Sequence, residues 1–469
     1  MNKAAWLWVG LVMAGTVQGA ALTPAQKQMR SIYQELVETN TTNSAGSCTV
    51  AAKKMARRLK DGGFKDGDMQ LVVPPGGPAK GNLVVRLKGD GSKKPLLLLA
   101  HFDVVEAKRE DWERDPFKLI EENDVFYARG SSDDKAMAAA LVHNMILYKK
   151  EQLAPRRDII LALTCDEEMI PSRFDGVDYL LQHYRPLIDA EIALNESGSP
   201  TAFLDKQDQP LSNGIQAGEE IYQSFQLEVT NPGGHSSAPY KDNAIYHLAE
   251  GLARLGQFSF PFKLSPVTRA YYERMATVQK GQVAEDMKAI LQEPPDQTAL
   301  DRLYALSPAH NSTVRTTYVA TRVDAGHADN ALPQRARAVV NCRILPGEAI
   351  AEVQATLQRV VADDKIRITR IGDGVAAPMA PMTPAVLKAV EETSNDIWPD
   401  VPVIPTLATG ATDGRFLNNA GIWTYGVTGM FQGPEGSGIH GLNEHLRVKS
   451  LFNGQEFLYR LAKRLASEP

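Results

Sequence analysis

Two side chains able to bind a metal ion or carry a proton follow the most apolar segment of the chain. Residues 96–100, "LLLLA", lead directly into His101 and Asp103. In an extended chain residues i and i+2 lie on the same face, so this imidazole and this carboxylate point the same way. Open α/β sheets bind ligands at the carboxyl ends of their strands. On this segment alone, a metal ligand beside an orienting carboxylate and a core histidine bonded to an aspartate are both consistent with the pattern.

Other predicted elements carry residues of the same kinds at their ends. They are Glu167 and Glu168 after "IILALTC", Glu196 after "EIALN", Asp133 and Asp134 at a helix start, and His440 in "GSGIHGLNEH". Each one alone is most often a solvated carboxylate or a hydrogen-bonded core histidine. Burying so many carboxylates without a cation would be costly, through desolvation and mutual repulsion. Two histidines and three acids at one sheet edge therefore predict two divalent cations bridged by a carboxylate.

The elements that must position these residues alternate between strands and helices. Apolar strand patterns at 82–89, 95–103, 158–168 and 190–198 are separated by helical patterns at 133–153 and 176–184, after a helical region from Thr23 to Gly62. This alternation predicts a largely parallel sheet that helices cover on both faces.

The order of elements changes after about residue 210. Strand and helix patterns then run β-α-β-β-α-β, which is typical of a ferredoxin-like domain, with an extra helical insertion between roughly residues 261 and 312. We therefore expect an α/β domain of residues 21–213 and 372–469, interrupted by a smaller α+β domain of residues 214–371. The length of 469 residues favours two domains.

Composition and the N-terminus limit the function classes. A hydrophobic content of 43% and a net charge of −5 are typical of a globular protein with no nucleic-acid or anionic-membrane partner. Lys3, an apolar run at 4–17 and small residues at 19–20 predict a secretory signal peptide of residues 1–20, and hence a periplasmic or secreted protein. A membrane anchor is the alternative reading of that run. The three cysteines allow at most one disulfide.

The motifs taken together resemble the co-catalytic di-zinc metallopeptidases that include aminoacylase-1, carboxypeptidase G, carnosinase-type dipeptidases, acetylornithine deacetylase and succinyl-diaminopimelate desuccinylase. The matching segments are "AHFDVV", "ARGSSDDKA", "TCDEE", "ALNESG", "GGHSSAP", "NALP", "GATDGRF" and "GIHGLNE", in family order. The resemblance implies a zinc-exopeptidase-type catalytic domain with two Zn²⁺ per chain, or Co²⁺ or Mn²⁺ in their place. The implied ligands are His101, Asp133, Glu168, Glu196 and His440.

The resemblance also implies roles around the metal site. Asp133 would bridge the two ions through a loop with a cis peptide to Asp134, Glu167 would be the general base, and Asp103 would orient His101. Two departures from the family pattern, Ala136 and His445, leave these residues intact.

The smaller domain is implied to be a lid through which the chain forms a homodimer. His235 would then stabilise an oxyanion in the partner subunit's active site, while Asn330 and Arg343 would hold the substrate's carboxylate. Arg415, in the main domain, would lie near the same pocket. The alternatives are a locally bonded loop histidine for His235 and an ordinary strand residue for Arg343.

The implied activity is hydrolysis of an amide bond next to a free carboxylate, in a small peptide or an N-acyl amino acid. An exported protein favours a carboxypeptidase or dipeptidase, and the alternative is an N-acyl amino acid deacylase. A related di-zinc aminopeptidase would lack the inserted domain. A catalytically inactive binding protein on the same fold would be expected to lose a ligand or Glu167, and all of them are present.

Overall fold

A nine-stranded sheet forms the centre of the computed structural model, which describes residues 21–169, 172–199 and 201–468. The predicted signal peptide lies outside these residues. The strand order is β1-β2-β6-β3-β7-β17-β9-β16, with β8 beside β9. The central strands β6, β3, β7 and β17 are parallel, and every side chain of β3 and β6 is buried. The predicted α/β class with a mostly parallel central sheet is confirmed. The strands are β1 (Met69–Val72), β2 (Asn82–Leu87), β3 (Leu96–His101), β6 (Ile159–Thr164), β7 (Ile192–Asn195), β8 (Phe203–Leu204), β9 (Pro210–Glu219), β16 (Val403–Ala408) and β17 (Trp423–Gly426).

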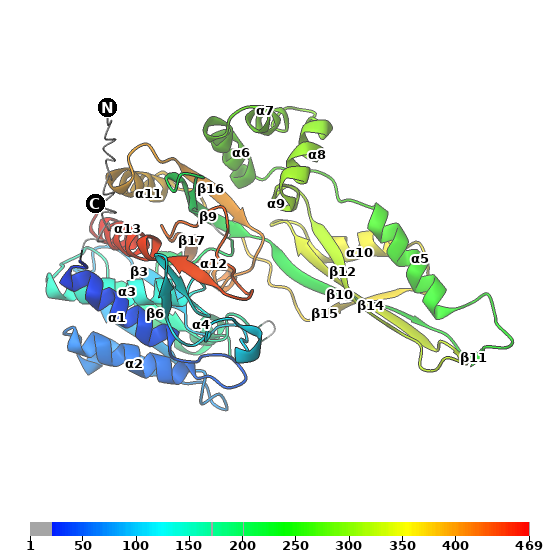
Figure 1. Cartoon of the computed structure of the whole chain (residues 1–469), viewed down its shortest axis with the longest axis horizontal. Helices are drawn as coiled ribbons and strands as arrows, with labels where there is room; N and C mark the ends of the chain where they lie inside the picture. The colour runs from blue at the N-terminus through cyan, green and yellow to red at the C-terminus, as the bar shows by residue number, and fades with distance from the viewer. Residues whose placement is uncertain (1–20, 170–171, 200, 469) are drawn as a thin grey trace, which may run out of the picture.

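Helices cover both faces of this sheet, as its apolar strands require (Figure 1). Leu96 and Leu98 pack into a core with α1, α2, α3, α11 and α13, whereas Leu97 and Leu99 pack into a second core with α4 and α12. Successive leucines therefore face opposite sides. The helices are α1 (Pro24–Val37), α2 (Cys48–Asp61), α3 (Lys135–Lys150), α4 (Gly176–Ile188), α11 (Pro384–Ile397), α12 (Gly414–Asn419) and α13 (Val448–Ser467), with short 3-10 turns at Asp66–Asp68 and Arg109–Asp111. A small sheet of β4 (Ile120–Glu122), β5 (Val125–Tyr127) and β18 (His445–Arg447) lies beside them.

The N-terminal helical region is two helices rather than one. Thr23 caps α1 with Pro24 in its first turn, as predicted, but α1 ends at Val37 and α2 begins at Cys48. The segment between them is rich in Thr, Asn and Ser, whose side chains compete for backbone hydrogen bonds and favour caps and turns. Ser47 caps α2 by accepting from the N–H of Val50.

The interrupting segment forms a separate four-stranded antiparallel sheet, which we call the lid sheet. Its order is β12-β14-β10-β15, and with α5 and α10 it follows the predicted β-α-β-β-α-β order of a ferredoxin-like fold. Both helices pack into one core with the buried side chains of β10 and β14. These elements are β10 (Ile221–Thr230), α5 (Ala244–Gln257), β12 (Thr317–Ala325), β14 (Arg335–Ile344), α10 (Ile350–Val361) and β15 (Arg367–Ile371).

The lid also contains two groups of elements outside the ferredoxin-like fold. The predicted helical insertion comprises α6 (Pro266–Val278), α7 (Gln282–Ala289), α8 (Gln297–Leu306) and α9 (Pro308–Ser312), and it packs against Ile404 of β16. A small two-stranded antiparallel sheet of β11 (Gly234–His235) and β13 (Ala331–Leu332) lies at the other extreme, at the end of the lid farthest from the large sheet (Figure 1).

A single residue, Glu220, joins a strand of the large sheet to a strand of the lid sheet. β9 pairs with β16 of the large sheet as far as Glu219, and β10 of the lid sheet begins at Ile221. The expected boundary at residue 214 therefore falls inside a strand of the large sheet. Residues 211–230 contain no proline and no two adjacent glycines that would mark the passage from one sheet to the other.

One disulfide links the N-terminal helices to the large sheet. Cys48 at the start of α2 bonds to Cys165, which follows β6, and Cys342 is buried with a free thiol. Within the described ranges, no helix is both long enough and apolar enough to traverse a lipid bilayer.

Candidate active site

Two imidazoles face the two oxygens of a single carboxylate. His101, the last residue of β3, has Nε2 3.1 Å from Oδ1 of Asp133. His440 has Nε2 3.2 Å from Oδ2 of the same carboxylate. Asp133 precedes α3 and is joined to Asp134 by a cis peptide, as expected. The structure thus brings together the predicted ligands from three distant segments, with Asp133 in the bridging position.

Two glutamates complete a three-residue group around each histidine. Glu196, just after β7, has Oε1 3.6 Å from Nε2 of His101. Glu168, just after β6, has Oε2 2.9 Å from Nε2 of His440. Asp134 also lies within reach of His101 and Glu196, but it accepts the backbone N–H of His101. The two oxygens of Asp133, in contrast, face both imidazoles.

The charges of these groups fit divalent cations. Burial, together with the neighbouring Asp133, raises the pKa of Glu196 well above its ordinary value, and the same causes raise the pKa of Glu168. Burial also raises the pKa of Asp134, and the nearby Asp133 adds to this rise. Carboxylates crowded in this way repel one another unless cations lie between them. Imidazole nitrogens and carboxylate oxygens are the ligands that zinc takes in proteins.

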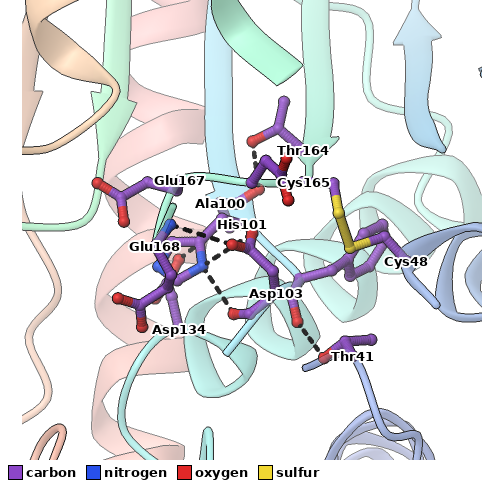
Figure 2. Close-up of polar contacts among 12 residues, drawn as sticks. Thr41, Cys48, Ala100, His101, Asp103, Asp134, Thr164, Cys165, Glu167 and Glu168 are labelled. Carbon is purple, nitrogen blue, oxygen red and sulfur yellow. Dashed lines mark hydrogen bonds and ion pairs between the residues drawn. A yellow bond between two sulfur atoms is a disulfide. The ribbon is translucent and has the colours of Figure 1, made fainter. Parts of the chain in front are cut away.

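Asp103 contacts two of the predicted ligands. Its backbone carbonyl accepts a hydrogen bond from Nδ1 of His101 at 3.0 Å, while its carboxylate lies 3.6 Å from the same nitrogen. The carboxylate also accepts the backbone N–H of Glu168 at 3.0 Å. With Nδ1 carrying the proton, Nε2 of His101 presents its lone pair toward Asp133. Figure 2 shows Asp103 beside both His101 and the Cys48–Cys165 disulfide.

The loop that carries Asp133 is held in place by Glu444, for which we predicted no role. Glu444 is fully buried, and its Oε1 accepts the backbone N–H groups of Ser132 and Asp133 at 2.7 and 3.0 Å. Its Oε2 accepts from Arg129 at 2.7 Å and from the N–H of Gly130 at 2.9 Å. The only sequence signal for Glu444 was its place in "GIHGLNE".

Glu167 stands next to the metal-ligand groups without being part of them. Its side chain is nearly buried and lines the cavity in front of these groups, which is described below. Burial raises the pKa of Glu167 well above the ordinary value. Arg415 lies 3.8 Å from Oε1 of Glu167 and 3.5 Å from Asp175. A carboxyl group with a raised pKa can both accept and release a proton near neutral pH.

Arg415 itself lies behind this group rather than in the cavity wall. It is buried, it donates to the carbonyl of Thr412 at 2.5 Å, and it is surrounded by carboxylates. The family resemblance implied that Arg415 lies near the substrate pocket and binds substrate, whereas its contacts in the structure are to Glu167, Asp175 and Thr412.

A cavity of about 890 Å³ opens in front of the site. Its wall includes Glu167, the four ligands other than the buried His101, and Arg343 from the lid sheet. Nη1 of Arg343 donates to the carbonyl of Thr409 at 3.1 Å, so the lid contacts the main domain at this point. His445, which replaces the usual aromatic residue, also lines the cavity.

His235 and Asn330 do not reach this cavity within their own chain. Both are exposed at the small sheet of β11 and β13 at the far end of the lid, where the carbonyl of Asn330 accepts the N–H of Ser236 (Figure 1). Nδ1 of His235 accepts the backbone N–H of Ser237 at 3.1 Å. The ring proton therefore resides on Nε2, which can donate outward.

Known proteins are similar to this chain in sequence and in fold. Human N-fatty-acyl-amino acid synthase/hydrolase PM20D1 (Homo sapiens) is 30% identical over 382 residues, 79% of this chain and 74% of that protein. A probable carboxypeptidase S-like 2 from Dictyostelium discoideum is 27% identical over 402 residues, 81% of this chain and 74% of that protein. The M20 family metallo-carboxypeptidase Sso-CP2 from Sulfolobus solfataricus has the same fold, with a TM-score of 0.68 at 19% identity over 93% of this chain and 98% of that one.

The family resemblance of the motifs is confirmed by a match over most of the chain. The sequence profile described as "Peptidase family M20/M25/M40" matches residues 97–464, which include every predicted metal ligand. The chain therefore belongs to peptidase family M20/M25/M40 and is a hydrolase of the metallopeptidase and amidohydrolase class.

Proposed function

We propose that this chain is a di-zinc hydrolase that cleaves an amide bond whose leaving amine is an amino acid with a free carboxylate. The observation that carries the proposal is the placement of Glu167 and Arg343 in one cavity with Asp133, whose two carboxylate oxygens face His101 and His440. His101, Asp133 and Glu196 would hold one ion, and His440, Asp133 and Glu168 the other. Ions bound there would lower the pKa of a bound water and polarise the amide carbonyl.

The residues of the chain supply the remaining steps. Glu167 accepts a proton from the attacking water and passes it to the leaving nitrogen, for which its raised pKa suits it. Arg343 binds the free carboxylate and so fixes which amide bond meets Glu167. Arg415 positions the carboxyl group of Glu167 from behind.

The preferred substrates are C-terminal peptide bonds or dipeptides. N-acyl amino acids are the second candidate, favoured by the 30% identity to a protein named N-fatty-acyl-amino acid synthase/hydrolase. All of these substrates place an amide carbonyl at a fixed distance from a carboxylate.

Assays of the zinc-loaded protein on dipeptides, N-acetyl amino acids and N-acyl amino acids with long chains distinguish these candidates. Each substrate is paired with its C-terminal amide, and we expect the amides to be hydrolysed far more slowly. Arg343→Gln should raise KM for the free acids alone. Arg337→Gln, which alters an arginine of the same strand that pairs with Glu228, is the control. Equal rates on acids and amides would contradict the proposal.

We also propose that the protein is exported and acts as a homodimer. The Cys48–Cys165 disulfide supports an oxidising compartment and agrees with the predicted signal peptide. The distance of β11 from the large sheet supports the second proposal, because His235 could then act only in a partner subunit (Figure 1). Exposed Tyr240, Tyr246, Val319 and Val323 give the lid an apolar surface for such contact.

A further inference from the structure

A buried acidic side chain in the cavity wall has no hydrogen-bond partner. Glu220 joins β9 to β10, is 1% exposed, and lines the cavity together with the metal-ligand groups. Neither oxygen of its carboxyl group forms a hydrogen bond with any described residue. Leaving a buried carboxylate unpaired is costly. Glu220 is therefore expected either to carry a proton or to pair with a positively charged group.

The residue proposed to bind substrate, Arg343, lines the same cavity wall as Glu220. Arg343 of β14 lies opposite Tyr222 in the lid sheet, with its guanidinium 4.8 Å from the centre of the Tyr222 ring. Burial raises the pKa of Glu220 to about 8, and the charge of Arg343 limits this rise. In turn, Glu220 partly offsets the lowering of the pKa of Arg343 that burial causes.

Glu220 also shares the cavity wall with Arg447, which pairs with Glu435 and Asp208. The N–H of Glu220 donates to the carbonyl of Ala408, and the following segment 409–412 has no ionisable side chain. The neighbouring Glu219 is directed to Thr412, from whose N–H and hydroxyl it accepts at 3.0 and 2.7 Å. Across the cavity stand the carboxylates of the metal-ligand groups, which bound cations would neutralise.

We propose that Glu220 competes with the substrate's carboxylate for Arg343 and thereby sets the affinity of the cavity for carboxylate ligands. This inference rests on the proposed function, in which Arg343 binds that carboxylate. When Glu220 is protonated, Arg343 is free to pair with the ligand. When Glu220 is ionised, it neutralises Arg343, and an incoming carboxylate meets a second negative charge.

The competition predicts a particular dependence on pH. Protonation of Glu220 favours ligand binding, so the affinity is fully present below its pKa and falls as the pH rises through that pKa. With a pKa of about 8, roughly a tenth of Glu220 stays protonated at about pH 9, so the dissociation constant rises about tenfold relative to about pH 6. Glu220→Gln cannot ionise and removes this part of the dependence.

Calorimetric binding of N-acetyl-leucine tests the inference without turnover. Zinc-loaded Glu167→Gln protein is compared with the Glu167→Gln/Glu220→Gln protein at about pH 6 and about pH 9. We expect equal affinities at the lower pH and about tenfold weaker binding by the protein that retains Glu220 at the higher pH. Glu228→Gln, which alters a carboxylate of β10 paired with Arg337, should reproduce the behaviour of the Glu167→Gln background.

Two results would overturn the inference. An identical pH dependence with and without Glu220 would show that its ionisation does not affect the ligand. A loss of affinity on Glu220→Gln substitution at both pH values would make Glu220 a support for the site rather than a competitor. Failure of the wild-type protein to hydrolyse any of the paired substrates would reject the proposed function separately, because the binding comparison needs no hydrolysis.

Discussion

Replacing Glu444 by glutamine should destabilise the loop that carries Asp133. Each oxygen of Glu444 accepts two hydrogen bonds, Oε1 from the N–H groups of Ser132 and Asp133 and Oε2 from Arg129 and the N–H of Gly130. A glutamine keeps one oxygen and turns the other acceptor into a donor. Whichever way the amide is oriented, its nitrogen faces two donors.

The structure sets the size of this effect. Two hydrogen bonds to a charged group are lost, each worth ~1.5–3 kcal/mol, so we expect the free energy of unfolding to fall by about 3–6 kcal/mol. The ion pair between Arg129 and Glu444 is almost fully buried, so water does not take over these bonds. Glu35→Gln is the matched control: its partner Arg58 lies at 2.7 Å but both side chains are partly exposed, and we expect a loss below about 1 kcal/mol.

Urea unfolding after chelation measures this loss without the contribution of bound metal. Added zinc should then stabilise Glu444→Gln less than the wild type, because the N–H of Asp133 has lost its acceptor. If the chelated variant unfolds within about 1 kcal/mol of the wild type, Glu444 does not hold the loop as argued.

The remaining predictions concern the metals, the base and the partner subunit. Metal analysis of protein purified without chelator should give two zinc ions per chain, and full activity with less than one would contradict the two ligand groups around Asp133. Glu167→Gln should retain metal and fold but lose ~10²–10⁴ in rate, and near-normal turnover would exclude Glu167 as the base. His235→Ala should lower kcat by ~10²–10³, more than it raises KM. A mixture of the His235→Ala and Glu167→Gln proteins should regain activity, since one of the two active sites in a mixed dimer has both an intact Glu167 and an intact His235. If exchange of chains is confirmed and no activity returns, His235 does not act across the dimer.

Local patterns in the sequence were sufficient to predict most of the strands and helices and to place histidine and acidic residues at the ends of strands. The run before His101 is apolar on every residue, so it had to be a strand covered on both faces, and a histidine and an acid after it had to lie at a sheet edge. The same reasoning placed Glu168 and Glu196 at the ends of β6 and β7. This reasoning needs only a short stretch of sequence, because burial and side-chain alternation are properties of a few consecutive residues.

Contacts between distant segments were decided only by the tertiary structure. Arg129 and Glu444 are 315 positions apart, and no periodicity connects them. Which oxygen of Asp133 faces which histidine, and the burial of Glu220 between the two sheets, likewise depend on how several segments close around one cavity. The sequence marked His235 by its glycines, but only the fold shows that it lies at the far end of the lid (Figure 1). A chain's local pattern determines where strands end, whereas the packing of whole elements determines which of those ends meet.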